Sequence, residues 1–541
     1  MSRAAAVART PGAPLLSGVA AFVASLNGLS AGVLAFAVGA LGALGHAPFH
    51  IWPLTLIAFT VFVWQLDGAA GKKAKRAAAF WRGWCLGFGY FLSGVWWVGS
   101  AFLVEPEQYA ALIPFAITAM PAGLALFWAA AAWVAIGFWR RDWRRVALLA
   151  SVLFFFEYLR GHVLTGFPWN MAGYVWPAGG PVSQSAAVIG AYGLTLLTLF
   201  AFMAPAALAG PERRRGARMT PAVISLFLFA GMFGLGFARL TLAPEGEDTG
   251  VRLRVVQAGI DQREKWRPEN RAMVRDRYLA LSASEGLSSR THVVWAESAL
   301  PMYLLEEPRV LDAIARTIGD DRVLLSGVVR RDFADPLQPR YYNSFAAISI
   351  DRGIPVVAGV YDKVKLVPFG EFPPFASLLR RIGLDALIDF SDGYTSGASR
   401  DTVEAPGAPP LSPQICYEVI FPRFALRGPD RPGWIVNVTN DAWYEGTPGP
   451  HQLYNQARYR SIEDGLPLAR AASGGVSAIV DAYGRTQAAL DATEEGVVDG
   501  DLPAALGPTP YAFIGDAPVF ALLGLGLIIG LTSRRRTAAR R

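Results

Sequence analysis

Long apolar runs fill almost all of the first 244 residues, and this feature limits the fold more than any other. A bilayer core of about 30 Å is crossed by one helix of about 20 mostly apolar residues. By this rule we predict eight membrane spans, centred near residues 37, 58, 92, 123, 154, 195, 229 and 523. The chain is therefore expected to be a polytopic α-helical membrane protein.

The composition agrees, because 53% hydrophobic and 17% charged residues make the chain too apolar for an ordinary soluble enzyme of 541 residues. The excess is uneven, since residues 245–510 have the composition of a globular domain. We therefore predict a transmembrane bundle of about seven helices over residues 1–244 and a soluble domain over 245–510. Residues 511–541 are expected to form a last span and a basic tail.

The first apolar run, from Pro14 to Gly45, is longer than one helix, so its beginning has two possible interpretations. Arg3 and Arg9 precede it, as basic residues precede the apolar region of a cleaved signal peptide. We favour a membrane helix over a signal peptide, because no clear stop separates this beginning from the next apolar stretch.

Basic residues gather in four places that predict the orientation: loops 71–76, 140–145 and 212–218, and the tail 534–541. With eight spans, all four lie on the side of the N-terminus. Lys and Arg are retained on the cytoplasmic side, so both termini should be inside and the soluble domain outside. These clusters also explain the net charge of +7 without a nucleic-acid partner.

The soluble domain alternates runs typical of strands with helical patterns. Two segments, 268–286 and 307–319, have apolar residues at helical spacing. The β-branched runs, each bounded by polar residues, Gly or Pro, predict strands within 251–260, 291–298, 321–329, 341–350, 353–363, 411–418 and 433–441. A layered α/β domain with largely buried sheets is therefore predicted.

Three of these strands end at Glu297, Lys363 and Cys416. Layered α/β domains bind ligands at strand ends, so these side chains are candidates for one site. A thiolate is a nucleophile, a carboxylate can move its proton, and an ammonium can stabilise an oxyanion, which together suit acyl transfer. The chain has only two cysteines, so Cys416 is either such a free thiol or a small buried hydrophobe.

The motifs around these residues resemble the nitrilase superfamily: "WAES" with Glu297, "YDKVKLVPFGEFPP" with Lys363 and Glu371, and "ICYEVIFP" with Cys416. Two further motifs, "NVTNDAWY" and "EYLRGHVLTGFPWN", narrow the resemblance. With them, the whole chain is similar to the apolipoprotein N-acyltransferase family, the membrane-embedded branch of that superfamily. The resemblance implies an αββα sandwich for the soluble domain and a periplasmic position on the bacterial inner membrane.

The resemblance also implies roles for individual residues. Glu297 would be the general base, Lys363 the oxyanion-stabilising cation and Cys416 the nucleophile. The supporting residues of the site would be Glu371, Tyr417, Glu418 and Trp266. Glu445 and Ser473 depart from the family's pattern, where Gly and Asn are usual. These two departures bear on the geometry of the loops over the substrate cleft.

The activity implied is transfer of an acyl chain from a phospholipid to the N-terminal amine of diacylglyceryl-cysteine in apolipoproteins, by a ping-pong mechanism through a thioester. The alternative is a membrane-anchored carbon–nitrogen hydrolase (amidase), and a transporter is disfavoured because the chain shows no internal repeat. No cofactor is implied. No metal site is expected from five scattered histidines, and we expect a monomer.

Three further features leave alternatives open. Phe369, Phe372 and Phe375 are candidates for an interfacial arm among lipids or for internal packing. Glu157 and Arg160, three apart on a predicted span, either pair with each other to fix the helix end or contact lipid headgroups. Trp96 and Trp97 are expected in the aromatic belt at the membrane surface.

Overall fold

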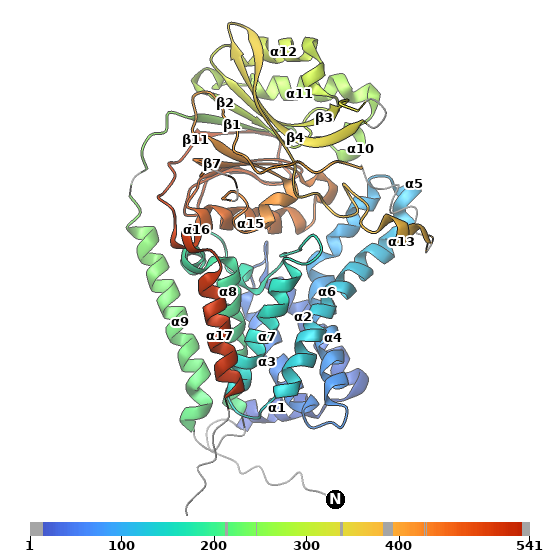
Figure 1. The fold of residues 1–541 in the computed structure, drawn as a ribbon, viewed down its shortest axis with the longest axis vertical. Helices are drawn as coiled ribbons and strands as arrows, with labels where there is room; N and C mark the ends of the chain where they lie inside the picture. The colour runs from blue at the N-terminus through green and yellow to red at the C-terminus, as the bar shows by residue number, and fades with distance from the viewer. Residues whose placement is uncertain are drawn as a thin grey trace, which may run out of the picture.

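The protein consists of a helical bundle with a layered domain on one end of it (Figure 1). The computed structural model describes residues 14–210, 215–244, 246–335, 339–381, 383, 393–426, 428 and 430–532. The long bundle helices are α1 (Pro14–Ser25), α2 (Gly28–Gly42), α3 (Trp52–Ala69), α4 (Lys75–Val95), α6 (Ile113–Ala135), α7 (Arg144–Arg160), α8 (Ala186–Met203), α9 (Arg215–Thr241) and α17 (Ala517–Leu531).

All eight predicted span centres fall inside one of these helices. The long first run is two helices, α1 and α2, separated at residues 26 and 27. By length and composition, five helical stretches among the described residues can cross a membrane: Gly28–Gly45, Lys75–Leu103, Pro106–Phe138, Val182–Ala209 and Gly216–Thr241. Arg3 and Arg9, on which the signal-peptide alternative depends, lie outside the described residues.

The end of the bundle away from the domain brings basic residues together. α1 and the carboxyl end of α17 both lie there (Figure 1). Arg140, from the loop before α7, and Arg144, the first residue of α7, donate hydrogen bonds to the carbonyl of Thr532, which follows α17. The basic tail 534–541 and residues 211–214 lie outside the described part of the chain.

The domain contains two sheets. The six-stranded sheet has the order β11-β1-β2-β3-β4-β5 and the five-stranded sheet the order β10-β9-β8-β7-β6. Pairs β1–β2–β3 and β6–β7–β8 are parallel, and the other pairs are antiparallel. The strands are β1 (Arg252–Gln257), β2 (His292–Trp295), β3 (Val323–Asp332), β4 (Arg340–Asp351), β5 (Ile354–Asp362), β6 (Leu411–Ile415), β7 (Trp434–Asn440), β8 (Leu468–Ser473), β9 (Ser477–Val480), β10 (Thr486–Leu490) and β11 (Gly496–Asp501).

The two sheets pack face to face through buried aliphatic side chains such as Val255, Val294, Val436 and Ile479. Helices α11 (Arg271–Ser282) and α12 (Pro308–Ile318) cover the outer face of the larger sheet. Helix α15 (Gly449–Asp464) lies between the smaller sheet and the bundle (Figure 1). Every strand and both helices that the sequence predicts in this domain are confirmed. The shorter helices among the described residues are α5 (Pro106–Tyr109), α10 (Gln262–Lys265), α13 (Ala376–Arg381) and α16 (Pro510–Ile514).

One face of α15 attaches the domain to the bundle by hydrogen bonds. Gln452 accepts from the indole of Trp169 at 2.7 Å, and Asn455 accepts from the amide of Ala178 at 3.0 Å. Farther along, Glu463 accepts from the amide of Ala191 in α8 at 2.6 Å. Because these bonds are directional, they fix the position of the domain as well as its contact with the bundle.

Candidate active site

The three predicted strand ends meet. β2 ends two residues before Glu297, β5 ends directly before Lys363, and β6 ends directly before Cys416. The Nζ atom of Lys363 lies 3.5 Å from Oε1 of Glu297, and both charges act on the Cys416 thiol. Because β2 and β5 belong to one sheet and β6 to the other, the site lies where the ends of the two sheets meet.

Cys416 has a strained backbone and begins a turn. Its φ angle is +48°, in the left-handed region that residues with a side chain rarely adopt. It is the first residue of a 3₁₀ turn, Cys416–Ile420, so it starts this turn and does not end the strand as the sequence suggested. The first amide groups of such a turn have no partner inside it and are available to a negative oxygen nearby.

Glu418 holds this turn against the segment that follows Lys363. Its Oε1 atom accepts from the amides of Val364 at 2.7 Å and Lys365 at 2.9 Å and from the hydroxyl of Tyr361 at 2.8 Å. Its Oε2 atom accepts from the amide of Ile415 at 2.9 Å. Burial raises the pKa of Glu418 to about 7, against the effect of these hydrogen bonds. Glu418 therefore fixes the turn that begins at Cys416 relative to Lys363.

Glu371 and Asn343 complete a polar cluster with Glu297 and Lys363. The Nζ atom of Lys363 donates to Oε1 of Glu371 at 2.8 Å. The amide nitrogen of Asn343 lies 2.7 Å from both Oε1 of Glu371 and Oε1 of Glu297. The other oxygen of Glu297 accepts from the backbone amide of Asn440 at 2.7 Å. All four side chains of the cluster are buried, so each hydrogen bond restricts the position of its side chain.

Sequence reasoning did not identify Asn343. The signal was an amide residue inside the apolar run of β4, where a polar side chain between buried neighbours needs a partner. It also did not identify Lys265, whose buried Nζ atom contacts the carbonyl of Glu297 at 3.4 Å. Burial lowers the pKa of Lys265 to about 8, against the effect of Glu297.

The electrostatics distinguish the thiol from the ammonium. Burial lowers the pKa of Lys363, but the carboxylates of Glu371 and Glu297 outweigh it, so the net shift is upward and the side chain stays charged. Burial raises the pKa of Cys416, the charge of Glu297 raises it further, and Lys363 opposes both. The resting thiol is therefore protonated, and it needs a proton acceptor when it reacts.

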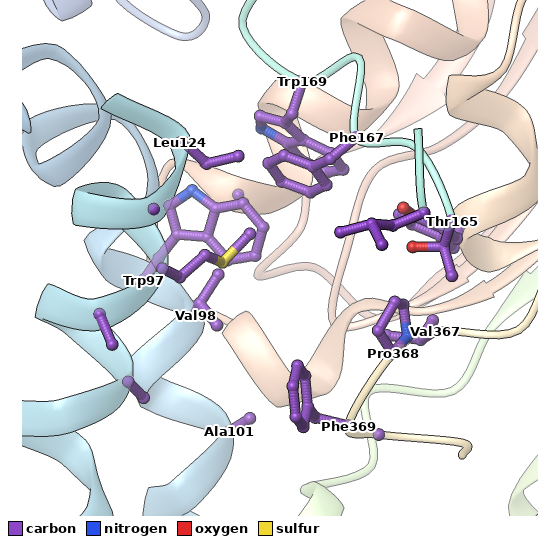
Figure 2. A pocket seen from close by; sticks show the side chains of 18 of the residues that line it. Trp97, Val98, Ala101, Leu124, Thr165, Phe167, Trp169, Val367, Pro368 and Phe369 are labelled. Carbon is purple, nitrogen blue, oxygen red and sulfur yellow. The ribbon is translucent and has the colours of Figure 1, made fainter. Parts of the chain in front are cut away.

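An apolar pocket of about 880 Å³ opens on Cys416. Its walls come from α6, with Met120, Gly123 and Leu124, and from the loops around Trp97 and Phe167. In Figure 2, Trp97 and Leu124 lie beside Phe167 and Trp169, with the ring centroids of Trp97 and Trp169 5.1 Å apart, while Val367, Pro368 and Phe369 form another side. The bundle and the domain both contribute to the pocket, and its lining is mostly hydrocarbon.

The sequence matches two family models: the N-terminal domain of apolipoprotein N-acyltransferase over residues 38–204, and carbon–nitrogen hydrolase over residues 239–511. A curated apolipoprotein N-acyltransferase of Rhodopseudomonas palustris is 42% identical over 530 residues, covering 96% of this chain and 98% of its own. Those of Bradyrhizobium diazoefficiens and Brucella melitensis are 40% and 39% identical, covering 94% and 96% of this chain and 95% and 100% of their own. The chain belongs to the apolipoprotein N-acyltransferase family.

The structure brings three of the other expected apolipoprotein N-acyltransferase residues to the site and leaves one outside it. Glu371 and Glu418 contact the triad region as described, and Tyr417 lines the pocket and donates to the carbonyl of Gly166. Trp266 follows α10 with 45% of its surface exposed, and within the described residues it is not among those that line the pocket.

The two departures from the family pattern differ in their surroundings. Glu445 is exposed, and its neighbouring charge is Asp261. Ser473 is buried at the end of β8, where it pairs with Asn440 of β7. Ser473 therefore touches the strand that carries a partner of Glu297, whereas Glu445 lies on the surface.

The expectation for Trp97 is wrong, because its side chain is only 4% exposed and belongs to the pocket wall. Its indole donates to Gln452 at 3.2 Å, and its ring lies 4.8 Å from that of Tyr444. Trp96 is 45% exposed, and its place in the aromatic belt stays a prediction. Of the arm candidates, Phe369 and Phe375 are exposed, which excludes internal packing for these two rings.

Proposed function

We propose that this protein transfers an acyl chain from a phospholipid to the N-terminal amine of the diacylglyceryl-cysteine of apolipoproteins. The transfer proceeds through a thioester on Cys416. The observation that carries the proposal is the apolar pocket that opens on this thiol and takes its walls from both the bundle and the domain. A hydrolase acting on small water-soluble amides has no need of such a wall.

The pocket has the dimensions of a site for an acyl chain. Its lining residues on α6 extend from Phe115 to Ala130, or about 22 Å of helix at about 1.5 Å per residue. This length exceeds the roughly 15 Å depth of the hydrocarbon in one leaflet. An acyl chain can therefore stay among apolar groups while its carbonyl reaches Cys416, avoiding a cost of about 0.8 kcal/mol per methylene exposed to water.

In the first half-reaction, Glu297 takes the proton of the Cys416 thiol and the sulfur attacks an ester carbonyl of the phospholipid. The ammonium of Lys363, held by Glu371, stabilises the negative oxygen of the tetrahedral intermediate. The carbon–oxygen bond then breaks, and Glu297 returns its proton to the departing oxygen of the lysophospholipid. The products are a lysophospholipid and an acyl thioester on Cys416.

In the second half-reaction, the unprotonated α-amine of the lipoprotein attacks the thioester carbonyl. Glu297 takes a proton from the attacking nitrogen, the carbon–sulfur bond breaks, and the proton passes to the Cys416 sulfur. The products are an amide-linked acyl chain and the original thiol.

We further propose that the chain crosses the inner membrane about eight times, with the bundle over 1–244, the periplasmic domain over 245–510 and the last span over 511–541. Support comes from the basic loop before α7, which meets the end of α17 on the side of the bundle away from the domain. Lys and Arg mark the cytoplasmic side. The exposed rings of Phe369 and Phe375 would then lie at the outer membrane surface.

Intact-mass spectrometry tests the function directly. The purified protein is incubated with a phospholipid, and Cys416→Ala is treated in the same way. The expected result is a gain of one acyl chain on the wild type alone, discharged by a diacylglyceryl-cysteine peptide and stable in water. Rapid discharge by water would instead favour the carbon–nitrogen hydrolase, and an adduct on Cys416→Ala would place the nucleophile elsewhere.

A further inference from the structure

A buried ion pair lies at the outer end of α7, close to the acyl pocket. The guanidinium of Arg160 donates to both carboxylate oxygens of Glu157, at 2.9 and 2.6 Å, and both side chains are only 2% exposed. The indole of Trp128 in α6 donates to the same carboxylate at 2.7 Å. The pair is thus fixed to a second helix, and headgroup contact, the alternative left open by the sequence, does not fit its burial.

Arg160 also fixes the loop that follows it, residues 161–169, here called the lip. Its backbone carbonyl accepts from the amide of Phe167 at 2.9 Å, and its guanidinium donates to the carbonyl of the same residue. The turn is tight, because a Cβ atom on Gly166 would lie 2.3 Å from the carbonyl oxygen of Gly161. The lip therefore has little freedom while Arg160 is in place.

The far side of the lip touches the residues that flank the nucleophile and the catalytic ammonium. The hydroxyl of Tyr417, next to Cys416, donates to the carbonyl of Gly166. The ammonium of Lys365, two residues after Lys363, donates to the carbonyl of Thr165 at 3.3 Å. Phe167 and Trp169 of the lip also line the acyl pocket (Figure 2).

We propose that Arg160 is a positioning residue for acyl transfer, acting on the Cys416 turn through the lip and Tyr417. The path is continuous: Glu157 orients Arg160, Arg160 fixes Phe167, and the adjacent carbonyl of Gly166 holds the Tyr417 hydroxyl. The amide of Tyr417 lies in the strained turn beside the thiol, where a displacement of about 1 Å costs about 100-fold in rate. The inference rests on the proposed function, because it requires that Cys416 is the nucleophile.

A double-mutant cycle on single-turnover thioester formation tests this path. Glu157→Gln/Arg160→Met removes the pair without leaving one buried charge alone, and Tyr417→Phe removes the tether from the other end. If both act through the lip, each slows acylation about 10-fold and the combination is also about 10-fold slower. A combined loss of about 100-fold, the product of the two, would overturn the proposal, as would an unchanged rate in Glu157→Gln/Arg160→Met.

Asp67→Asn/Arg145→Met is the matched control, because the buried Arg145 pairs with the half-buried Asp67 at 3.1 Å at the other end of α7. Its effect should multiply with that of Tyr417→Phe. If Glu157→Gln/Arg160→Met does not fold, Arg160→Lys takes its place in the cycle with the same criterion. Wild-type protein without a thioester would instead contradict the proposed function, so the two failures are distinguishable.

Discussion

The two walls of the site are built on different principles. On one wall, Glu297, Lys363, Glu371 and Asn343 are connected by contacts of 2.7 to 3.5 Å, all from the domain. On the other wall, bundle and lip residues such as Gly123 and Phe167 contribute apolar surface around a pocket of about 880 Å³. Directional bonds position reacting atoms, whereas shape and volume select a chain. Changes in the first wall should therefore affect rate, and changes in the second should affect which substrate is used.

The largest effects are expected from the charges of the polar wall. Glu297→Gln should lower turnover by about 1,000-fold, because the proposed proton acceptor is lost. It should also lower the pKa of Cys416, since Glu297 raises that pKa, and so increase the rate of thiol alkylation at pH 9. Lys363→Met should lower turnover too but slow alkylation, because Lys363 holds the same pKa down. Alkylation rates that change in the same direction in both variants would contradict the assignment.

Asn343→Leu should lower turnover by about 100-fold without changing the preferred acyl chain. The variant removes the amide that bridges Glu297 and Glu371, and misplaced reacting groups cost rate. Rates measured with donors of 8 and 16 carbons should fall by the same factor. A change in the ratio of the two rates would mean that the polar wall also selects the chain.

Gly123→Phe should instead change the preferred acyl chain. A Cβ atom on Gly123 meets nothing within 4 Å, and the residue faces the pocket, so a ring there fills acyl-chain space. We expect about a 10-fold slower reaction with 16-carbon donors and little change with 8-carbon donors. Gly231→Phe on α9 is the control, because its Cβ position is equally open and it is not among the pocket lining residues that the structure describes.

The smallest effect concerns stability and pH. Burial raises the pKa of Glu418 and Asp464 to about 7 and that of Glu463 to about 8. Because the folded-state values lie above those of exposed carboxyl groups, the stability contribution is full below about pH 4.5 and is lost as the pH rises through 7 to 8. The Tm in detergent should therefore fall from pH 5.5 to pH 8.5. Asp464→Asn should make this fall shallower, and a Tm that rises with pH would refute the assignment.

Local pattern was enough to predict strands β1 to β7, the helices at the span centres and the candidate residues Glu297, Lys363 and Cys416, but not strands β8 to β11. Each of these three residues lies at the end of a predicted strand, and a strand with its bounding residues is visible in one segment of sequence. Asn343 and the lip contacts were not predictable in this way, because their partners are distant along the chain: Tyr417 and Gly166 are 251 residues apart. Trp97 was misassigned for the same reason, since whether its side chain is exposed or buried depends on its contact with α15.

The shared acceptor on α15 has an evolutionary consequence. The single oxygen Oε1 of Gln452 accepts from the indoles of Trp97 and Trp169, which come from two separate parts of the bundle. Replacing Gln452 leaves the buried indole of Trp169 without its acceptor, whereas the indole of Trp97 also donates to the carbonyl of Gly94 at 3.1 Å. Substitutions at these positions are thus expected to occur together, so that bundle and domain are inherited as one unit. A domain exchanged between distant relatives would meet a bundle without the matching residues.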